Sequence, residues 1–432
     1  YHWLMAVSNA PLHSRSLSLD HQSLSKILIE RENLLIIQDL DGVCMGLVKD
    51  PLTRVNKTRY LEAAKSLGSH FYVLTNGEHI GQRGVNGIVE KAVANPSIVK
   101  EQGLYLQGLA GGGVQWQDSY GKVSHPGVSD AELAFLNAVP DQIANCLREL
   151  GQKLKLGLSQ TQLEECIQAA VLDNKVSPTA NLNVFHEALL DRPELYADLQ
   201  QEIEKLMDRL LDQARQQGLE DSFFVHYAPN LGRDEQGQEI MQPSQGKDSG
   251  TTDFQFMLRG AIKEVGVLVI LNRYYYGQTG SYPLGAEFNV RQAPRDQPAL
   301  LKLVKDNFDP AIMPTIVGVG DTVTSKAVEN GSEIEFKRGG SDRGFLELIQ
   351  LLSQEFNTGN VVVYIDSSGG EVKNRKALKL DHSNPESIKV TEGPGDSRDT
   401  EDPLTLNLVF PGGHRQYIDF FCHVAQTRKY TK

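Results

Sequence analysis

The chain has 432 residues, of which 40% are hydrophobic and 23% are charged, and its formal net charge is −12. This composition is ordinary for a soluble globular protein, and the length favours two or three structural units over one core. The negative charge argues against a nucleic-acid partner, which requires a basic surface. It also means that a phosphate-binding site must gather positive charge locally.

The cysteines and the apolar segments indicate the environment of the protein. The four cysteines lie far apart and form no C-x-x-C pair (Cys44, Cys146, Cys166 and Cys422). This spacing fits reduced thiols better than a zinc site or a disulfide scaffold. No apolar run approaches the roughly 20 residues that span a bilayer. Residues 1–18 lack the pattern of a secretion signal. We therefore expect an irregular terminus and a cytoplasmic protein with no membrane partner; the sequence does not fix its oligomeric state.

The first part of the chain alternates strand and helix signals. Residues 33–38 form a short apolar run typical of a strand that is buried on both faces of a parallel sheet. Residues 57–67 predict a helix with Gly68 as its C-terminal cap, and residues 70–74 predict a second buried strand. This β-α-β spacing fits a right-handed parallel crossover.

The middle of the chain has a different pattern. The alternating V-Q-W-Q from Val114 predicts a hairpin strand. Residues 129–218 are rich in leucine at helical spacing, which predicts helices that face a core. Residues 223–227 predict another strand, and a polar loop is expected over 230–250.

The last part returns to alternating elements. Residues 252–264 predict a helix and residues 265–271 a strand. Residues 314–321 repeat the design of the first strand, because an apolar run again ends in an aspartate. The elements predicted after it are a helix over 342–352, a strand over 361–365 and a mobile acidic loop over 393–403.

Polar side chains follow three of the predicted strands. Asp39 and Asp41 follow the first, Thr75 and Asn76 the second, and Asp321 the strand that repeats its design. Because parallel strands share one carboxyl edge, where open α/β sheets bind ligands, we expect these side chains to meet. Clustered carboxylates need a cation beside them, and oxygen ligands suit Mg²⁺. The sequence therefore predicts a magnesium-assisted site for a phosphoryl group.

Several segments carry a resemblance to known phosphatases. D-L-D-G-V at Asp39, V-L-T-N at Val73 and V-G-V-G-D at Val317 resemble, in this order, the first, second and fourth motifs of the haloacid dehalogenase (HAD) superfamily. The longer strings T-N-G-E-H, G-K-D-S-G-T-T-D-F-Q-F, N-R-Y-Y-Y, K-D-N-F-D-P and G-V-G-D-T-V-T-S are similar to the glucosylglycerol 3-phosphate phosphatases, salt-tolerance enzymes of photosynthetic bacteria. The resemblance runs from about Leu17 to near the end of the chain. It implies a magnesium-dependent hydrolase of a small sugar phosphate that makes a compatible solute.

The resemblance implies a role for each residue at the predicted sheet edge. Asp39 would be the nucleophile and would form an aspartyl-phosphate. Asp41 would act first as general acid and then as general base. Thr75 and the backbone N–H of Asn76 would hold phosphate oxygens. Asp39, the Asp41 carbonyl and Asp321 would bind Mg²⁺.

Two expected residues of the family pattern are not at their usual places. A second acid commonly follows the fourth-motif aspartate by four or five residues, where this chain has Ser325 and Lys326. Asp342, or a water molecule, is the candidate to replace it at the metal. For the phosphate-binding lysine we favour Lys247, which follows a glycine and precedes a predicted helix. The other candidates are Lys263, Lys302 and Lys305.

The resemblance also implies the architecture. We expect an α/β fold with a HAD-like doubly wound parallel sheet as its core and a large inserted cap. The core would comprise residues 17–80 and 223–432, and the cap residues 81–222. Such a cap would select a small sugar and exclude water while the phosphoenzyme exists.

Sugar selection would fall to residues close to the cap. Glu78 and His79 directly follow the second motif, and Gln115 and Trp116 lie in the expected cap. The Trp116 ring would stack on a sugar face, with packing against the protein as the alternative.

Other functions stay open from the sequence. A phosphatase for sucrose, trehalose or glucosylglycerate phosphate would share these motifs. The missing second acid also fits a catalytically silent regulator with the same fold. Finally, D-x-D pairs occur where glycosyltransferases bind a metal and a nucleotide sugar, although no nucleotide-binding feature accompanies the pair here.

Overall fold

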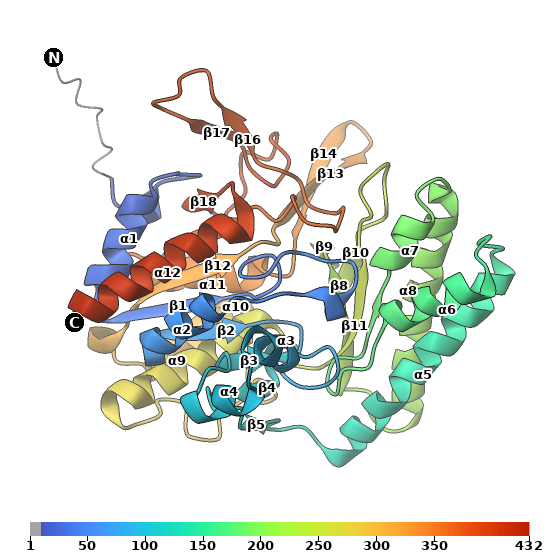
Figure 1. Ribbon diagram of the computed structural model, residues 1–432, viewed down its shortest axis with the longest axis horizontal. Helices are drawn as coiled ribbons and strands as arrows, with labels where there is room; N and C mark the ends of the chain where they lie inside the picture. Colours follow the sequence, from blue (N-terminus) through green and yellow to red (C-terminus); the bar gives the residue numbers. More distant parts are fainter. Residues whose placement is uncertain (1–9, 432) are drawn as a thin grey trace.

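Two sheets organise the chain in the computed structural model, which describes residues 10–431 (Figure 1). Residues 1–9, part of the expected irregular terminus, lie outside the described residues. The larger sheet has eight strands. In spatial order they are β18 (Leu408–Phe410), β15 (Val361–Ile365), β12 (Thr315–Gly320), β1 (Leu34–Gln38), β2 (Phe71–Leu74), β3 (Gly108–Ala110), β4 (Gln115–Gln117) and β5 (Val123–Ser124).

This sheet is mostly parallel. The strands from β18 to β3 run parallel to one another, and β4 and β5 add an antiparallel hairpin at one edge. In the centre, Ile36 of β1 lies between Val317 of β12 and Phe71 of β2. The strands predicted over residues 33–38, 70–74, 314–321 and 361–365 correspond to β1, β2, β12 and β15. These four strands are neighbours in the sheet.

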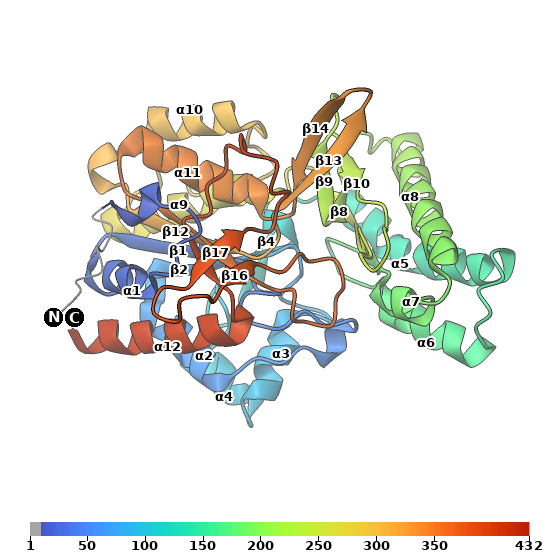
Figure 2. The same cartoon turned by 90° about the horizontal axis from the view of Figure 1, so that it is seen from above.

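Helices cover both faces of the sheet. Leu35 and Ile37 of β1 belong to one hydrophobic layer, whereas Leu34 and Ile36 belong to the other, because alternate residues of a strand face opposite sides. The first layer contains α9 (Lys263–Thr279), α10 (Gln297–Asn307) and α11 (Arg343–Phe356). The second contains α1 (His21–Glu30), α2 (Thr58–Leu67), α3 (Val85–Ala92), α4 (Pro96–Gln102) and α12 (Gly413–Thr431). Figure 2 shows the two layers on either side of the strands, which confirms the predicted doubly wound α/β core.

The smaller sheet has four antiparallel strands. In order they are β6 (Val171–Leu172), β7 (Thr179–Asn181), β11 (Asp253–Leu258) and β8 (Phe223–Ala228). Beside it lie the helices predicted within residues 129–218, which are α5 (Asp130–Lys153), α6 (Gln160–Ala170), α7 (Asn183–Ala188) and α8 (Pro193–Gln216) (Figure 1). The rings of Phe135, Phe223 and Phe256 pack together between this sheet and α5. We call the small sheet and these helices the cap.

The strand pairing corrects the expected domain boundaries. Strands β3 to β5 fall within residues 81–222, which we assigned to the cap, but they extend the core sheet. Strands β8 and β11 fall within residues 223–432, which we assigned to the core, but they complete the cap sheet. The cap is therefore the segment between β5 and α9. Sequence patterns reveal a strand but not its partner, so the expected boundaries were wrong at both ends.

Two neighbouring elements have the opposite type from the prediction. The helix expected over 252–264 contains strand β11, and the strand expected over 265–271 lies inside helix α9. In α9 every residue from Lys263 to Asn272 is buried. A helix that is buried all round has no polar face, so its apolar run imitates a buried strand.

Three hairpins complete the described part of the chain. They are β9 (Asn230–Arg233) with β10 (Glu239–Met241), β13 (Thr324–Asn330) with β14 (Glu333–Gly339), and β16 (Lys379–Asp381) with β17 (Lys389–Glu392). The first of them occupies the polar loop expected over 230–250.

The acidic segment 393–403 is attached to the rest of the protein. It has no regular structure, as predicted, but Asp399 accepts a hydrogen bond of 2.8 Å from Arg338 Nε, and Asp402 accepts one of 2.8 Å from Arg343 Nη1. These ion pairs correct the expectation of a loop free to move.

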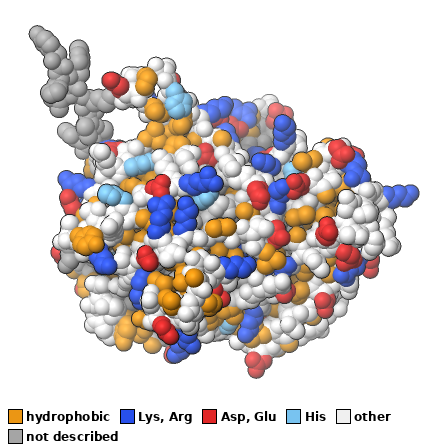
Figure 3. All heavy atoms as spheres, viewed as in Figure 1, with side chains coloured by type: hydrophobic (Ala, Val, Ile, Leu, Met, Phe, Trp, Pro, Cys, Tyr) orange, Lys and Arg blue, Asp and Glu red, His pale blue; other side chains and the backbone are white. Residues whose placement is uncertain are grey.

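The surface and the helices bear on possible partners. On the face drawn in Figure 3, acidic and basic side chains are interspersed rather than separated by sign. Among the described residues, no helix combines the length and the apolar character that a membrane span requires.

The central strand gives a test of the packing. Ile37 has 0% exposure in β1, and we expect Ile37→Ala to lower the free energy of unfolding by about 2–5 kcal/mol through the cavity it leaves. Ile388, which is 40% exposed, provides the control, because Ile388→Ala should change stability by no more than about 0.5 kcal/mol. Urea unfolding measures both. Equal stability of the two variants would contradict a central position for β1.

Candidate active site

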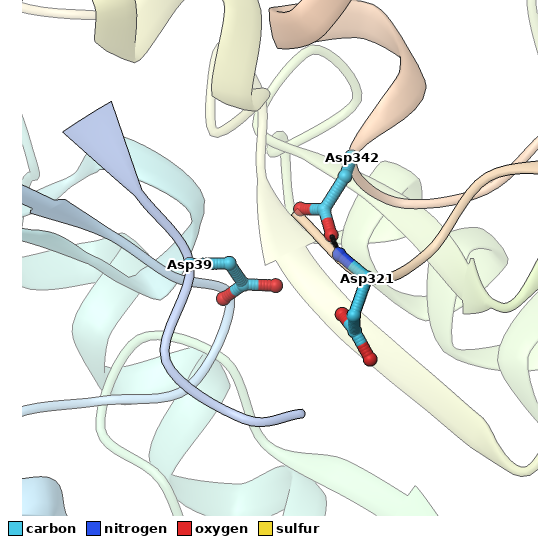
Figure 4. Close-up of side chains that lie close together, drawn as sticks. All are labelled: Asp39, Asp321 and Asp342. Carbon is cyan, nitrogen blue, oxygen red and sulfur yellow. Dashed lines mark hydrogen bonds between the residues drawn. The ribbon is translucent and has the colours of Figure 1, made fainter. Parts of the chain in front are cut away.

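Three aspartates from different parts of the chain meet at one edge of the core sheet (Figure 4). Asp39 directly follows β1, Asp321 directly follows β12, and Asp342 directly precedes α11. All three are buried, and one carboxylate oxygen of each lies within 4.8 Å of the others. The Asp39 N–H donates to the Val319 carbonyl, so the pairing of β1 with β12 fixes where the carboxylate points.

A buried lysine lies against this cluster. Lys263, the first residue of α9, places its Nζ 3.0 Å from Asp39 Oδ2 and 2.7 Å from Asp342 Oδ1. Burial acts to lower the pKa of Lys263, but the charges of Asp342 and Asp39 outweigh it and raise that pKa above its usual range. The lysine is therefore charged, and it holds two of the three aspartates.

The position of Lys263 corrects the prediction for the phosphate-binding lysine. Lys247 is exposed and precedes strand β11, whereas the predicted geometry required a lysine at a helix start. Lys263 occupies such a start, at the head of α9. Lys247 therefore lacks the helix start on which its selection depends, because the predicted helix is one element too early.

Asp342 is the most completely satisfied of the three aspartates. Its Oδ2 accepts a hydrogen bond of 2.9 Å from the backbone N–H of Asp321 (Figure 4). The same oxygen accepts one of 3.1 Å from the Thr322 N–H, and Oδ1 accepts one from Lys263. Burial acts to raise its pKa, but Lys263 and the Asp321 N–H bring it below its usual value. Asp342 is thus a fixed negative charge that orients Lys263 and the end of β12.

The other two aspartates are less well compensated. Burial and the charge of Asp342 raise the pKa of Asp39 well above its usual range, although Lys263 opposes the shift. Burial likewise raises the pKa of Asp321 to about 6, with Arg375 opposing it and Asp342 adding to it. The Nε of Arg375 lies 3.6 Å from Asp321 Oδ2. A bound cation beside such carboxylates would favour their ionised forms.

The donor set fits a small divalent cation. Asp321 Oδ2 is buried and has no hydrogen-bond partner among the described residues. A Cβ on Gly42 would lie 2.0 Å from that oxygen, and Gly42 has a φ of +80°, so both space and backbone require glycine there. Carboxylate oxygens with room beside them are the ligands that Mg²⁺ accepts.

Asp41 and Thr75 lie close to each other. Both oxygens of Asp41 lie 3.3 Å from Nη1 of Arg54, and Thr75 Oγ1 accepts a hydrogen bond of 3.1 Å from the Gly77 N–H. A Cβ built on Gly77 would be 3.6 Å from Thr75 Oγ1 and 3.9 Å from Asp41 Oδ2, so these groups share one small region. The side chain of Asn76, in contrast, contacts Nε2 of His226 in the cap at 2.8 Å.

A cavity of 120 Å³ lies between the core and the cap beside Asp41. Its polar lining comes from both domains. The core supplies Asp41, Arg54, Asn76, Glu78, Arg83, Asn374 and Arg375, and the cap supplies Asn174, Thr179, Asn181, Asn183, Thr252, Asp253 and Gln255. The cavity therefore has charged groups near the aspartate cluster and amide, hydroxyl and carboxyl groups on the cap side.

Glu78 borders this cavity but binds the protein with both oxygens. It accepts hydrogen bonds from the backbone N–H groups of Lys175, Val176 and Ser177 at 2.9–3.1 Å, and one from Gln115. Its structural role is to hold a cap segment against the core, which the sequence did not predict.

His79 and Trp116 lie away from the cavity. His79 has 0% exposure, and its Nε2 lies 3.1 Å from the Gly108 carbonyl oxygen. Trp116 is on β4 near the far edge of the core sheet, with the Arg273 guanidinium 3.8 Å from its ring. The structure therefore brings neither residue to the cavity: His79 follows the second motif but is buried in the core, and the strand of Trp116 belongs to the core sheet rather than to the cap.

Most polar residues of the cavity were not predicted from the sequence, and four of them show why. Arg54 and Arg375 come from loops, where a lone arginine gives no recognisable pattern. Asp253 and Gln255 alternate with phenylalanines in D-F-Q-F, a period of two that predicts a strand with one polar face. The strand signal is therefore in the sequence, although the pattern over 252–264 as a whole predicts a helix.

An aspartate held by a lysine, with further carboxylates beside it at a parallel sheet edge, can perform phosphoryl transfer with the help of a cation. Comparison with known proteins agrees with this class. A family model described as glucosylglycerol-phosphate phosphatase matches residues 33–425. A protein named glucosylglycerol-phosphate phosphatase, from Synechocystis sp. (strain ATCC 27184 / PCC 6803 / Kazusa), is 57% identical over 418 residues, which are 97% of this chain and 98% of the relative. The chain belongs to the glucosylglycerol-phosphate phosphatase family, as the resemblance predicted.

Two solved structures are more distant. The C-terminal domain of trehalose-6-phosphate phosphatase from C. albicans is 12% identical, with 95% of this chain and 98% of that chain covered and a TM-score of 0.44. Trehalose-6-phosphate phosphatase from Aspergillus fumigatus is 9% identical. The match covers 95% of this chain and 99% of that chain, with a TM-score of 0.36.

The two lysines give a test of the buried cluster. Lys263→Met leaves Asp39 and Asp342 buried without their counter-charge, and we expect a loss of about 3–5 kcal/mol in the free energy of unfolding, measured by urea without added Mg²⁺. Lys247→Met alters an exposed side chain and should change stability by no more than about 0.5 kcal/mol. The reverse order of the two losses would contradict the assignment of Lys263.

Proposed function

We propose that this protein hydrolyses glucosylglycerol 3-phosphate to glucosylglycerol and phosphate, with Mg²⁺ as cofactor. The observation that carries the proposal is the contact of Lys263 Nζ with Asp39 Oδ2 at 3.0 Å, in the same cluster as Asp321, whose Oδ2 accepts no hydrogen bond from the described residues. It joins a nucleophile, a cation and an open carboxylate oxygen in one place. The name of the 57% identical relative supports the choice of substrate.

In the first step, a carboxylate oxygen of Asp39 forms a bond to phosphorus as the bond from phosphorus to the sugar-side oxygen breaks. Asp41 donates a proton to that oxygen, so glucosylglycerol leaves as a neutral alcohol. Lys263, which contacts Asp39, and the Thr75 hydroxyl hold the phosphoryl oxygens. The product of the step is an aspartyl-phosphate on Asp39.

In the second step, water attacks the phosphorus of the aspartyl-phosphate. Asp41, now ionised, takes a proton from the water, and the bond from phosphorus to Asp39 breaks. Phosphate leaves and both aspartates return to their starting forms. Contact with Arg54, at 3.3 Å from both Asp41 oxygens, keeps Asp41 at the cavity through the two steps.

The residues that would hold Mg²⁺ are Asp39 and Asp321, with the Asp41 carbonyl and with Asp342 in the same cluster. When bound, Mg²⁺ would neutralise charge on the transferred phosphoryl group and align it with Asp39. Asp342 then replaces the acid that the family pattern puts four or five residues after Asp321, because it reaches the same cluster from the start of α11. Asp342 Oδ2 already accepts hydrogen bonds from two backbone N–H groups. Asp342 would therefore contribute mainly its negative charge and the orientation of Lys263 and of the end of β12.

The proposed activity has a biological setting. Glucosylglycerol is uncharged and rich in hydroxyl groups, so a cell can accumulate it as a compatible solute. We accordingly place the protein in the cytoplasm, acting in solute synthesis under salt stress.

The nucleophile is tested with Asp39→Asn. The amide cannot form the aspartyl-phosphate, and we expect kcat for glucosylglycerol 3-phosphate to fall by about 10³-fold or more. Phosphate release is measured for the wild type, for this variant and for the control Asp198→Asn, an exposed residue of α8. Besides glucosylglycerol 3-phosphate, each protein is assayed with sucrose 6-phosphate and trehalose 6-phosphate. No phosphate release by the wild type from any of them would overturn the phosphatase proposal.

The metal is tested by removing it and by binding. A chelator should abolish phosphate release, and added Mg²⁺ should restore it. By calorimetry, Asp321→Asn should bind Mg²⁺ at least about tenfold more weakly than the wild type, because it loses a charged ligand. Asp198→Asn again serves as the control. Full activity in the chelator, or unchanged affinity in Asp321→Asn, would refute the proposed magnesium site.

A further inference from the structure

The cap sheet turns a polar face toward the core. In β11, Phe254 and Phe256 are fully buried in the hydrophobic core of the cap, so Asp253 and Gln255 face the other way. Both of these residues line the cavity beside Asp41. The alternation of β11 therefore separates a face that folds the cap from a face that borders the candidate active site.

Neighbouring strands extend this polar face. Across the sheet, Asn181 lies directly opposite Asp253, and Thr179 lies directly opposite Gln255. Directly opposite residues in a sheet share a face, and these two also line the cavity. The four side chains form a continuous polar wall, which we call the cap wall.

The cap wall is closed against the core by a loop that follows β15. Asn374 Nδ2 donates to the Gly250 carbonyl at 3.1 Å and to Thr252 Oγ1 at 3.2 Å, just before β11 begins. The next residue, Arg375, reaches Asp321. One short loop thus connects the cap wall to the aspartate cluster, and a ligand in the cavity lies between them.

Two acceptor atoms of the cap wall have no donor. Asp253 Oδ1 and Gln255 Oε1 are both buried and have no hydrogen-bond partner among the described residues. In contrast, the Asn181 Oδ1 is satisfied, because it accepts from the N–H and the side-chain amide of Asn183. A buried acceptor without a donor is unfavourable, so a fold that keeps two of them side by side indicates a ligand that supplies donors.

The chemistry of these atoms identifies the end of the ligand that they receive. A phosphate dianion offers only acceptors, and the carboxylate of Asp253 would repel it. Sugar hydroxyl groups donate hydrogen bonds and carry no charge. Burial and the charge of Asp41 raise the pKa of Asp253 to about 7, with Arg375 opposing the shift, so its carboxyl group can both accept from and donate to hydroxyls near neutral pH.

We propose that Asp253 and Gln255 determine specificity by binding the hydroxyl groups of the glucosyl part of the substrate. This inference rests on the proposed phosphatase function. It adds the orientation of the substrate between the aspartate cluster and the cap wall. The phosphate is bound at Asp39, Lys263 and Thr75, and the sugar extends past Asp41 onto the cap wall.

The test compares two substrates that share the same phosphate ester. Glucosylglycerol 3-phosphate carries the sugar, and glycerol 3-phosphate lacks it. Gln255→Leu removes the acceptor at similar size, and Asp253→Ala removes the carboxyl group. For each variant we expect the ratio of kcat/KM for the two substrates to fall by about 10- to 100-fold, chiefly through KM for the sugar substrate.

Matched variants separate this role from a general loss of structure. Gln255→Glu keeps an acceptor at the same place and should recover most of the ratio that Gln255→Leu loses. Asp198→Ala and Gln201→Leu make the same kinds of change on the exposed side of α8 and should leave the ratio unchanged. For Asp253, the milder Asp253→Asn keeps one acceptor and should give a smaller fall than Asp253→Ala.

The outcomes are distinct for the two proposals. An unchanged ratio in Gln255→Leu and Asp253→Ala, or an equal loss on both substrates, overturns the role of the cap wall and leaves the phosphatase intact. If the wild type prefers another sugar phosphate to glucosylglycerol 3-phosphate, the proposed substrate is wrong. The role of Asp253 and Gln255 is then tested with the ratio of kcat/KM for the preferred sugar phosphate to kcat/KM for glycerol 3-phosphate. An unchanged ratio in the variants overturns that role.

Discussion

The contact of Lys263 with Asp39 and Asp342 is the interaction on which the site depends. Three buried carboxylates within 4.8 Å repel one another, and each loses hydration, so they persist only with positive charge among them. Lys263 supplies it from the first residue of α9. The helix must therefore begin against the carboxyl edge of the sheet. Gly266 permits this, because a Cβ there would lie 2.7 Å from Leu74 Cδ1 of β2.

The strand-end aspartates could be predicted because their signal is local. An apolar run of strand length followed by Asp39 or Asp321 needs no knowledge of distant contacts, and parallel pairing then brings the two together. Lys263 could not be found this way. Its helix is buried on every side, so the periodicity that would mark the helix start is missing. Lys247 has the better local context, so the sequence pattern favours it over Lys263.

Contacts between distant segments account for the remaining differences. β11 pairs with β7, more than seventy positions earlier, and β3 pairs with β2 across two helices. The sequence pattern specifies strands but not these partners, so the cap boundaries were misplaced. The same limit explains Trp116. Its strand was predicted, but only the sheet order places it near the far edge, with Arg273 rather than a sugar on its ring.

The distribution of charge in the cavity resolves how a chain with a net charge of −12 can receive a phosphate ester. Cationic groups are gathered on the core side, where Arg54 and Arg375 line the cavity and contact Asp41 and Asp321, and where the buried Lys263 contacts Asp39 behind them. Acceptors without donors are gathered on the cap side, in Asp253 and Gln255. In the proposed reaction these two sides complement the two ends of one molecule, a phosphate that needs positive charge and a sugar that offers hydroxyls. The reversed orientation would bring the phosphate against the Asp253 carboxyl and leave the cap acceptors unpaired. Electrostatics and hydrogen bonding therefore favour the same direction of binding, the one that presents phosphorus to Asp39.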